Sequence, residues 1–209
     1  QTCALPICLS EVNQEAFHHS KDLLVEICQS AFNLNVRLFI DAEESWIQNT
    51  IDLLAYEMMV KFNQKQAIIF NTFQMYRVDM LENLTEAIQA AKDKKYYLGA
   101  KLVRGAYLEK ERQRAHEDEY SEPLHKDKEH TDRDFNAGTL ACLNNINHVN
   151  FCIGTHNELS CRLLIEEMTK LNIANNHPNI YFAQLLGMSD NISYNLAASG
   201  YNVAKYVPY

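Results

Sequence analysis

The sequence predicts a parallel α/β fold, and three observations support this prediction. Short apolar runs rich in β-branched and aromatic residues recur six times along the 209-residue chain, without the polar alternation of half-exposed strands. Helical patterns lie between successive runs, which indicates parallel pairing through right-handed crossovers. No linker rich in Ser, Gly or Pro interrupts the alternation. We therefore expect one domain over most of the chain.

Each element follows from local patterns, beginning with a helix over about 12–32. The six predicted strands are 36–40, 67–70, 98–103, 149–153, 180–185 and 203–207. Between them, apolar residues recur at helical steps of three and four, as at Ile47, Ile51, Leu54 and Met58. The charged segment 108–130 is longer than a usual connection. It reads as a solvated helix followed by a surface loop, or as a cover over a ligand.

Composition excludes several classes of protein. The chain has 19 Lys+Arg against 27 Asp+Glu, a net charge of −8, so we expect no nucleic-acid partner. No apolar run approaches the roughly 20 residues that span a bilayer. The six cysteines show neither a CxxC pair nor zinc-ligand spacing, so we expect no metal site and predict reduced, buried thiols in an intracellular protein.

A doubly wound sheet and a (β/α)8 barrel both fit this pattern, although a barrel of about 250 residues would be incomplete here. In both architectures, ligands bind at the carboxyl ends of the strands. The polar or close-approach residues at these ends are Asp41, Asn71, Lys101, Arg104, Gly105, Thr155, His156, Asn157, Gln184 and Tyr206.

Most of these candidates have a structural alternative. Asp41, Asn71 and Asn157 could instead be helix N-caps. His156 could be a structural histidine, and Tyr206, like Tyr107, could pack at the rim of the sheet. Lys101 is harder to explain in this way, because a lysine in a buried strand needs an anionic or acceptor partner.

Six strings, in this order and at these separations, resemble the proline dehydrogenase family. They are 39–44 (FIDAEE), 69–74 (IFNTFQ), 98–107 (LGAKLVRGAY), 154–157 (GTHN), 184–188 (QLLGM) and 205–209 (KYVPY). The resemblance covers about residues 9–209. The wording of the strings is closer to monofunctional, mitochondrial-type enzymes than to the large bifunctional bacterial ones.

The resemblance implies a distorted (β/α)8 barrel with non-covalent FAD at its carboxyl face. Members transfer a hydride from C5 of L-proline to flavin N5, giving Δ1-pyrroline-5-carboxylate, and a quinone reoxidises the flavin. It also implies a bacterial cytoplasmic protein with possible peripheral membrane association, or a protein of the mitochondrial matrix or inner membrane.

Site residues follow from the resemblance by position. Lys101 would lie near flavin N5, where many bacterial members have arginine, and Asp41 would line the active site. The remaining implied cofactor contacts are Asn71 at the pyrimidine edge, Val103, Gly105 and Ala106 through their backbone, Thr155, His156 and Asn157 at the ribityl and pyrophosphate portion, and Lys128 and Thr131 at the adenine side. The implied substrate contacts are Tyr107, Leu185 and Tyr206.

Two departures from the family suggest that the chain is a fragment. The family's first two strands and the helix after its eighth strand, which holds the substrate carboxylate, have no counterpart here. We therefore expect six βα units that match the third to eighth strands, with residues 8–209 as a partial barrel domain. Residues 1–7 resemble a translated sequencing adapter, and we interpret them as an artefact. We expect such a fragment to be inactive alone.

Two other hypotheses remain open. A phosphate-binding barrel lyase or isomerase would use Lys101 as a Schiff-base amine, and it would be colourless. A non-catalytic barrel scaffold would show neither colour nor activity.

Overall fold

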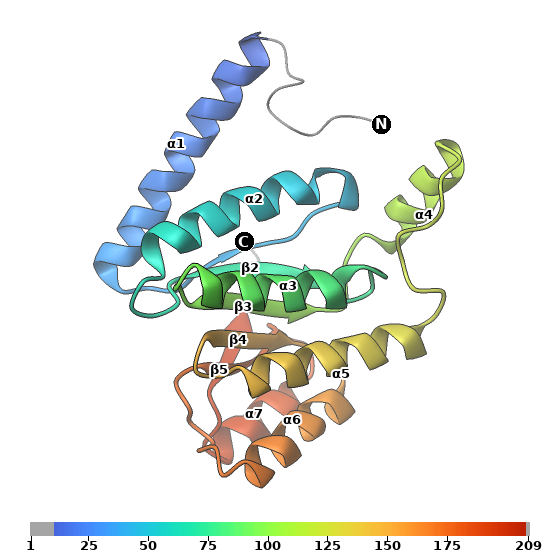
Figure 1. Cartoon of the computed structure of the whole chain (residues 1–209). Coiled ribbons are helices and arrows are strands. Elements are labelled where there is room, and N and C mark those ends of the chain that lie inside the picture. Colours follow the sequence, from blue (N-terminus) through green and yellow to red (C-terminus); the bar gives the residue numbers. More distant parts are fainter. Residues whose placement is uncertain (1–10, 208–209) are drawn as a thin grey trace.

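The computed structural model describes residues 11–207 and consists of a curled parallel sheet with helices along its outer side (Figure 1). The predicted artefact at residues 1–7 lies outside the described residues. The elements in chain order are α1 (Glu11–Leu34), β1 (Leu38–Ile40), α2 (Ser45–Phe62), β2 (Ile69–Gln74), α3 (Met80–Asp93), β3 (Leu98–Val103), α4 (Leu108–Glu117), α5 (Lys128–Asn144), β4 (Val149–Gly154), α6 (Glu158–Lys170), β5 (Ile180–Leu185), α7 (Asp190–Ala198) and β6 (Val203–Tyr206).

The strand order of the sheet decides between the two predicted architectures. The order is β1-β2-β3-β4-β5-β6, and every neighbouring pair is parallel. A doubly wound sheet reverses its strand order at a switch point, so that alternative is wrong. The hydroxyl of Tyr206 in β6 nevertheless lies 3.2 Å from Asp41 Oδ2, just after β1. Since these strands are at opposite edges, the sheet curls into a half-barrel.

The predicted strand bounds are confirmed for β3 and β5 and need correction for β2. The apolar run predicted a strand that ends at Phe70, whereas β2 continues to Gln74. Asn71, Thr72 and Gln74 are buried polar residues whose side chains each form at least one hydrogen bond, which lowers the cost of burying them within the strand. Asn71 therefore does not lie at a strand end, and it caps no helix, because the N-cap of α3 is Asp79.

The charged segment 108–130 contains the predicted helix and loop. Helix α4 ends at Glu117, and a loop leads to α5, which begins at Lys128. The loop is fixed to the body by backbone hydrogen bonds from Val78 to the Pro123 carbonyl and from His125 to the Tyr76 carbonyl. Asp134 of α5 also pairs with His125 at 2.8 Å.

The main core lies between the sheet and the outer helices. Its largest fully buried side chains include Phe73, Leu98, Leu102, Phe135 and Phe151. The four described cysteines, Cys28, Cys142, Cys152 and Cys161, are free and buried, as predicted. Burial raises the pKa of the Cys152 thiol to about 12, so this thiol stays protonated at neutral pH.

The inner face of the half-barrel is aromatic at its amino end. Phe39 and Phe70 pack with ring centroids 4.8 Å apart. The Arg37 guanidinium lies 4.4 Å from the centroid of the Tyr181 ring and donates to the Pro178 carbonyl. Mainly apolar and aromatic side chains line a hollow at this end, whereas the polar candidates lie at the carboxyl end, where parallel α/β folds bind their ligands.

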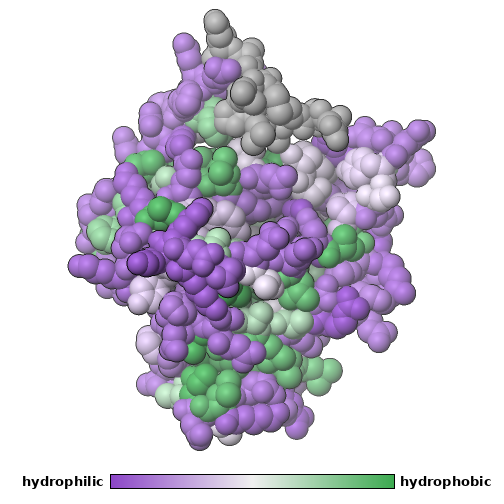
Figure 2. All heavy atoms as spheres, in the orientation of Figure 1, coloured by the Kyte–Doolittle hydropathy of each residue, from purple (hydrophilic) through white to green (hydrophobic). Residues whose placement is uncertain are grey.

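The outer surface is mainly hydrophilic, with hydrophobic side chains in separate patches on the visible face (Figure 2). Helix α1 extends past the edge of the sheet (Figure 1), and it exposes Ile27 and Leu34. Within residues 11–207, no helix combines the length and the apolar character that crossing a bilayer requires.

Candidate functional site

Lys101 lies at the centre of a polar cluster on the inner face of the half-barrel. Its register partners, Thr72 on β2 and Cys152 on β4, share this face. The Lys101 ammonium donates to Asp41 Oδ1 at 2.5 Å and lies 5.0 Å from the centroid of the Tyr206 ring. The lysine side chain is 15% exposed and the Asp41 side chain 47%. The acceptor predicted for Lys101 is therefore Asp41, and Asp41 caps no helix, because the N-cap of α2 is Glu44.

The loop between β1 and α2 also fixes Tyr107. The Tyr107 hydroxyl donates to Glu43 Oε2 at 2.7 Å, and this hydrogen bond is the main reason that the pKa of the phenol is raised. Gln74 connects the same loop to the turn after β3. Its amide donates to the Glu43 carbonyl at 2.7 Å, and its Oε1 accepts from Ala106 N at 3.3 Å. Tyr107 and Ala106 are thus held against the same loop that carries Asp41.

The turn after β3 brings the backbone close to its neighbours. Gly105 has φ +145°, and a Cβ placed there would lie 2.5 Å from the Tyr76 ring. A larger residue would therefore displace the Tyr76 ring. Val103 ends β3 on the inner face, and a Cβ at Gly154 would lie 3.1 Å from its Cγ1. Glycine at both positions therefore allows the close packing of Tyr76 and Val103 at this rim.

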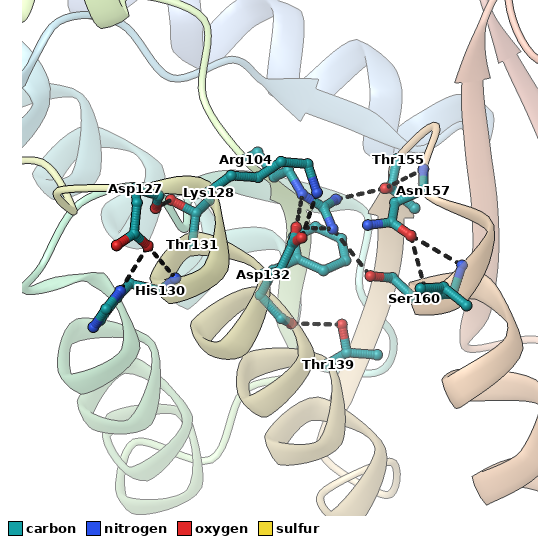
Figure 3. A network of polar contacts seen from close by, with 12 residues as sticks. Arg104, Asp127, Lys128, His130, Thr131, Asp132, Thr139, Thr155, Asn157 and Ser160 are labelled. Carbon is teal, nitrogen blue, oxygen red and sulfur yellow. Dashed lines mark hydrogen bonds and ion pairs between the residues drawn. The ribbon is translucent and has the colours of Figure 1, made fainter.

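Arg104 organises a second cluster at the ends of β3 and β4 (Figure 3). Its guanidinium donates to Asp132 at 2.7 Å, to Thr155 Oγ1 at 2.6 Å and to Ser160 Oγ at 3.0 Å. The guanidinium carbon also lies 4.3 Å from the centroid of the Phe135 ring. One side chain therefore joins β3 to β4, α5 and α6.

Lys128 and Thr131 lie at the start of α5, beside this cluster. Lys128 donates to Asp132 from the solvent side. Burial of Asp132 raises its pKa, but the hydrogen bonds from Lys128 and Arg104 outweigh this effect, so its pKa is below the usual range. Thr131 is turned to its own helix start, where its hydroxyl donates to the Asp127 carbonyl at 3.3 Å.

The segment after β4 combines structural and exposed groups. Asn157 is the N-cap of α6 and accepts from the backbone of Leu159 at 2.9 Å, so its capping interpretation is confirmed. Thr155 Oγ1 also accepts from Asn157 N at 3.0 Å. His156 is exposed, and its Nδ1 lies 3.1 Å from Ser189 Oγ on the next loop.

Leu185 and Asn71 differ in which face of the sheet they occupy. Leu185 pairs with Tyr206 across β5 and β6 and is half exposed near the Lys101 cluster. Asn71 pairs with Ile40 and Ala100 on the outer face, where its amide donates to Asp52 of α2 at 2.7 Å. The structure therefore brings most of the other predicted residues together in two adjoining clusters and leaves Asn71 apart. Gln184 also lies apart, buried on the outer face of β5, where its Oε1 accepts from the Ser193 hydroxyl of α7 at 2.8 Å.

Arg104 was predicted as a charged residue at the end of a buried strand. Glu43 and Gln74 are absent from the predicted site, although their side chains build it. Glu43 and Gln74 carry no such signal, because their role depends on contacts with residues 64 and 31 positions away.

Comparisons with known proteins agree with this architecture. The family model described as "Proline dehydrogenase" matches residues 6–209. The chain is 38% identical to human proline dehydrogenase 1, mitochondrial, over 88% of this chain and 31% of that protein. It is 35% identical to the Drosophila melanogaster protein of the same name, over 94% and 30%. A hydroxyproline dehydrogenase from Xenopus laevis is 33% identical, over 96% and 44%.

Solved structures match the fold. Proline utilization A from Bdellovibrio bacteriovorus, inactivated by N-propargylglycine, superposes with a TM-score of 0.81 at 22% identity, over 92% of this chain and 20% of that chain. Proline utilization A from Bradyrhizobium japonicum gives 0.77 at 22% identity, over 90% and 19%. The chain spans about a third of the length of its first curated relatives. On the strength of the family match over nearly its whole length, the chain belongs to the proline dehydrogenase family.

Proposed function

We propose that the protein containing this chain is an FAD-dependent proline dehydrogenase that oxidises L-proline to Δ1-pyrroline-5-carboxylate. The observation that carries the proposal is the Lys101 ammonium on the inner face, held by Asp41 at the carboxyl end of the strands. When bound, FAD would supply the acceptor for the hydride from C5 of proline.

The residues present fit such a cofactor. Gly154, Ala183 and Ala204 share the inner face of β4, β5 and β6, since Gly154 pairs with Ala183 and Ala183 with Ala204. This row offers a flat surface without large side chains, which suits a planar ring system. Val103 of β3 lies beside Gly154, and Lys101 lies two residues before Val103 on the same face, where a cation can stabilise negative charge on such a ring.

The second cluster offers groups for the phosphate-bearing part of the cofactor. Arg104, Lys128, Thr155 and Asn157 supply cationic and hydroxyl or amide groups at the ends of β3 and β4, and anions bind well to such donor sets. His156 is exposed beside them. The Thr131 hydroxyl bonds the Asp127 carbonyl at the start of its own helix. Thr131 would therefore help to fix the first turn of α5 beside the cofactor rather than bind the cofactor itself.

The backbone of Val103, Gly105 and Ala106 would lie close to the cofactor. The predicted flavin contact of Asn71 remains a prediction from the family resemblance, and Gln74 on the inner face is the better-placed amide.

The substrate would lie between the cofactor and the rim residues. Asp41 accepts from the Lys101 ammonium and from the Tyr206 hydroxyl, so the three side chains form one connected group. Tyr206, Leu185 and Tyr107 would pack on the proline ring and exclude water from C5. Positioning of this kind is worth about 7–11 kcal/mol in well-oriented reactions.

Partners and location follow the named relatives. Several of them are called mitochondrial, so we propose a mitochondrial location for a eukaryotic source. A quinone as the final electron acceptor and peripheral membrane association complete the proposal, with the bacterial cytoplasm as the location for a bacterial source. The boundary of the barrel domain near residue 8 is part of the same proposal.

The test uses the complete protein that contains this chain. We expect it to purify yellow, to release FAD on denaturation and to reduce an artificial electron acceptor in the presence of proline. A colourless protein that fails to bind added FAD would contradict the proposal. Trapping of Lys101 by borohydride would instead support a Schiff-base lyase or isomerase, and absence of both colour and activity would support a scaffold; the family membership favours neither.

A further inference from the structure

A buried carboxylate on α4 takes no part in the two clusters described above. Glu111 is 0% exposed, yet it lies one turn into a highly charged helix. Its Oε1 accepts from the backbone N–H of Ser45 at 2.6 Å, and its Oε2 accepts from the Ser45 hydroxyl at 2.7 Å. Burial of a carboxylate is costly unless hydrogen bonds satisfy it, and both of these come from the same residue.

These two hydrogen bonds replace a missing helix cap. Helix α2 begins at Ser45, its N-cap Glu44 forms no side-chain capping bond, and its first turn contains no acidic residue. Glu111 supplies the negative charge that a helix N-terminus favours, from a helix 66 positions further along the chain.

The same contact joins the two segments that carry the rim residues. Ser45 directly follows the loop that bears Asp41 and Glu43, and Glu111 N donates to the carbonyl of Tyr107 at 2.9 Å. The Tyr107 hydroxyl in turn donates to Glu43 Oε2 at 2.7 Å. The contacts therefore form a closed ring through Ser45, Glu111, Tyr107 and Glu43.

Further contacts stabilise this ring from both sides. Lys110 donates to Glu44 at 2.7 Å, and the buried Gln48 accepts from Glu43 N at 2.8 Å. Arg114 lies 4.3 Å from the centroid of the Trp46 ring. Among these contacts, only the Ser45–Glu111 pair places a fully buried carboxylate against the first residue of α2.

We propose that Glu111 is a positioning residue, which fixes Tyr107 and the loop 41–44 relative to each other and thereby orients Asp41 toward Lys101. Its effect on turnover rests on the proposed proline oxidation. Its effect on the loop does not, so the two can be tested separately.

The kinetic test compares variants of the complete protein. Glu111→Ala removes both acceptors, and we expect kcat/KM for proline to fall by about 10- to 100-fold, because small displacements of positioned groups have effects of this size. Glu111→Gln keeps an acceptor for Ser45 N–H and should restore most of the loss. Glu109→Ala, an exposed position on the same helix, is the matched control and should have wild-type kinetics.

A double-mutant cycle separates positioning from a general structural role. Tyr107→Phe removes the hydroxyl that donates to Glu43, so Glu111→Ala should cost several-fold less in that background than in wild type. Additive losses would overturn the proposal. If Glu111→Ala fails to fold, Ser45→Ala replaces it in the cycle, with a smaller loss expected.

Hydrogen exchange measures the loop without reference to activity. Peptides covering 41–48 should exchange faster in Glu111→Ala and remain unchanged in Glu109→Ala. Unchanged exchange, or faster exchange with wild-type kcat/KM, would refute the positioning role. If the wild-type protein does not oxidise proline, the proposed function fails, and the exchange result alone decides the inference.

Discussion

The two polar clusters of the half-barrel differ in how they are assembled. Arg104 binds partners on β4, α5 and α6, which follow β3 along the chain, and its guanidinium stacks on the buried Phe135. Lys101 instead binds Asp41 after β1 and contacts Tyr206 in β6, at the two edges of the sheet, and Asp41 is 47% exposed.

This difference separates a structural framework, the Arg104 cluster, from the proposed reaction surface, the Lys101 cluster. The Arg104 contacts are numerous, geometrically fixed and local in the sheet, so they stabilise the end of β3 whatever is bound. The Lys101 contacts depend on the curl of the sheet and leave one side of the cluster accessible. Substitutions in the two clusters should therefore affect different measurements.

The largest effect is expected at Lys101. In the complete protein, Lys101→Met should lower the rate of proline-dependent flavin reduction by about 10²–10³, because one charge that stabilises the transition state is lost. Stopped-flow absorbance measures this rate. Lys65→Met, at an exposed position in the turn between α2 and β2, serves as the control. A rate near that of wild type would exclude the proposed role of Lys101.

The second effect concerns stability rather than rate. Arg104→Lys keeps the charge but loses the planar fork that bonds Asp132, Thr155 and Ser160, so the free energy of unfolding should fall by about 2–3 kcal/mol. Denaturant titration measures this loss. The control is Arg162→Lys, whose exposed ion pair with Glu166 should contribute less than about 0.5 kcal/mol. Equal losses in both variants would show that Arg104 is not a framework residue.

The pH dependence of stability tests the Arg104 cluster separately, through Asp132. The pKa of Asp132 is lower in the folded protein than its ordinary value, because hydrogen bonds from Lys128 and Arg104 outweigh burial. This stabilisation is present above the unfolded pKa and is lost as the pH falls toward the folded pKa. The free energy of unfolding should therefore decrease as the pH falls below about 4, the ordinary pKa of an aspartate, and Asp132→Asn should flatten this slope. An identical slope in the variant would contradict the assignment.

The smallest effect is expected on substrate choice. Tyr206 places a phenol beside Lys101 on the exposed inner face, where it should crowd a hydroxyl on C4 of the proline ring. The enzyme should prefer proline to hydroxyproline in kcat/KM, and Tyr206→Ser should narrow the ratio. A wild-type preference for hydroxyproline would show that the ring does not lie against Tyr206.

The sequence predicts the order and bounds of the elements better than it predicts which face of the sheet each strand residue occupies. The apolar runs define β3 and β5 to the residue, and the isolated lysine in β3 correctly indicates an anionic partner, Asp41. Asn71 was misplaced because a buried polar strand cannot be distinguished from a strand end by hydrophobicity alone. Its face follows from the register with β1 and β3, which is a tertiary property.

Long-range partners account for the remaining gaps in the predicted site. Glu43, Gln74 and Glu111 act through contacts that span 31 to 66 positions. Their types fit an exposed helix or loop equally well, so burial was needed to reveal them. The Asn157 cap was predictable because it acts on the helix directly after it.

The strand order has a consequence for how the protein forms. Each of the strands β2 to β5 pairs with the strand before it and the strand after it in the chain. During synthesis, every new βα unit therefore meets a hydrogen-bonding edge that the preceding unit has just presented, and the sheet can grow from its amino-terminal side without waiting for distant segments. The contacts of Tyr206 with Asp41 and Lys101 can form only after β6 has been added. The reaction surface would then be the last part of this chain to assemble, on a framework that is already complete.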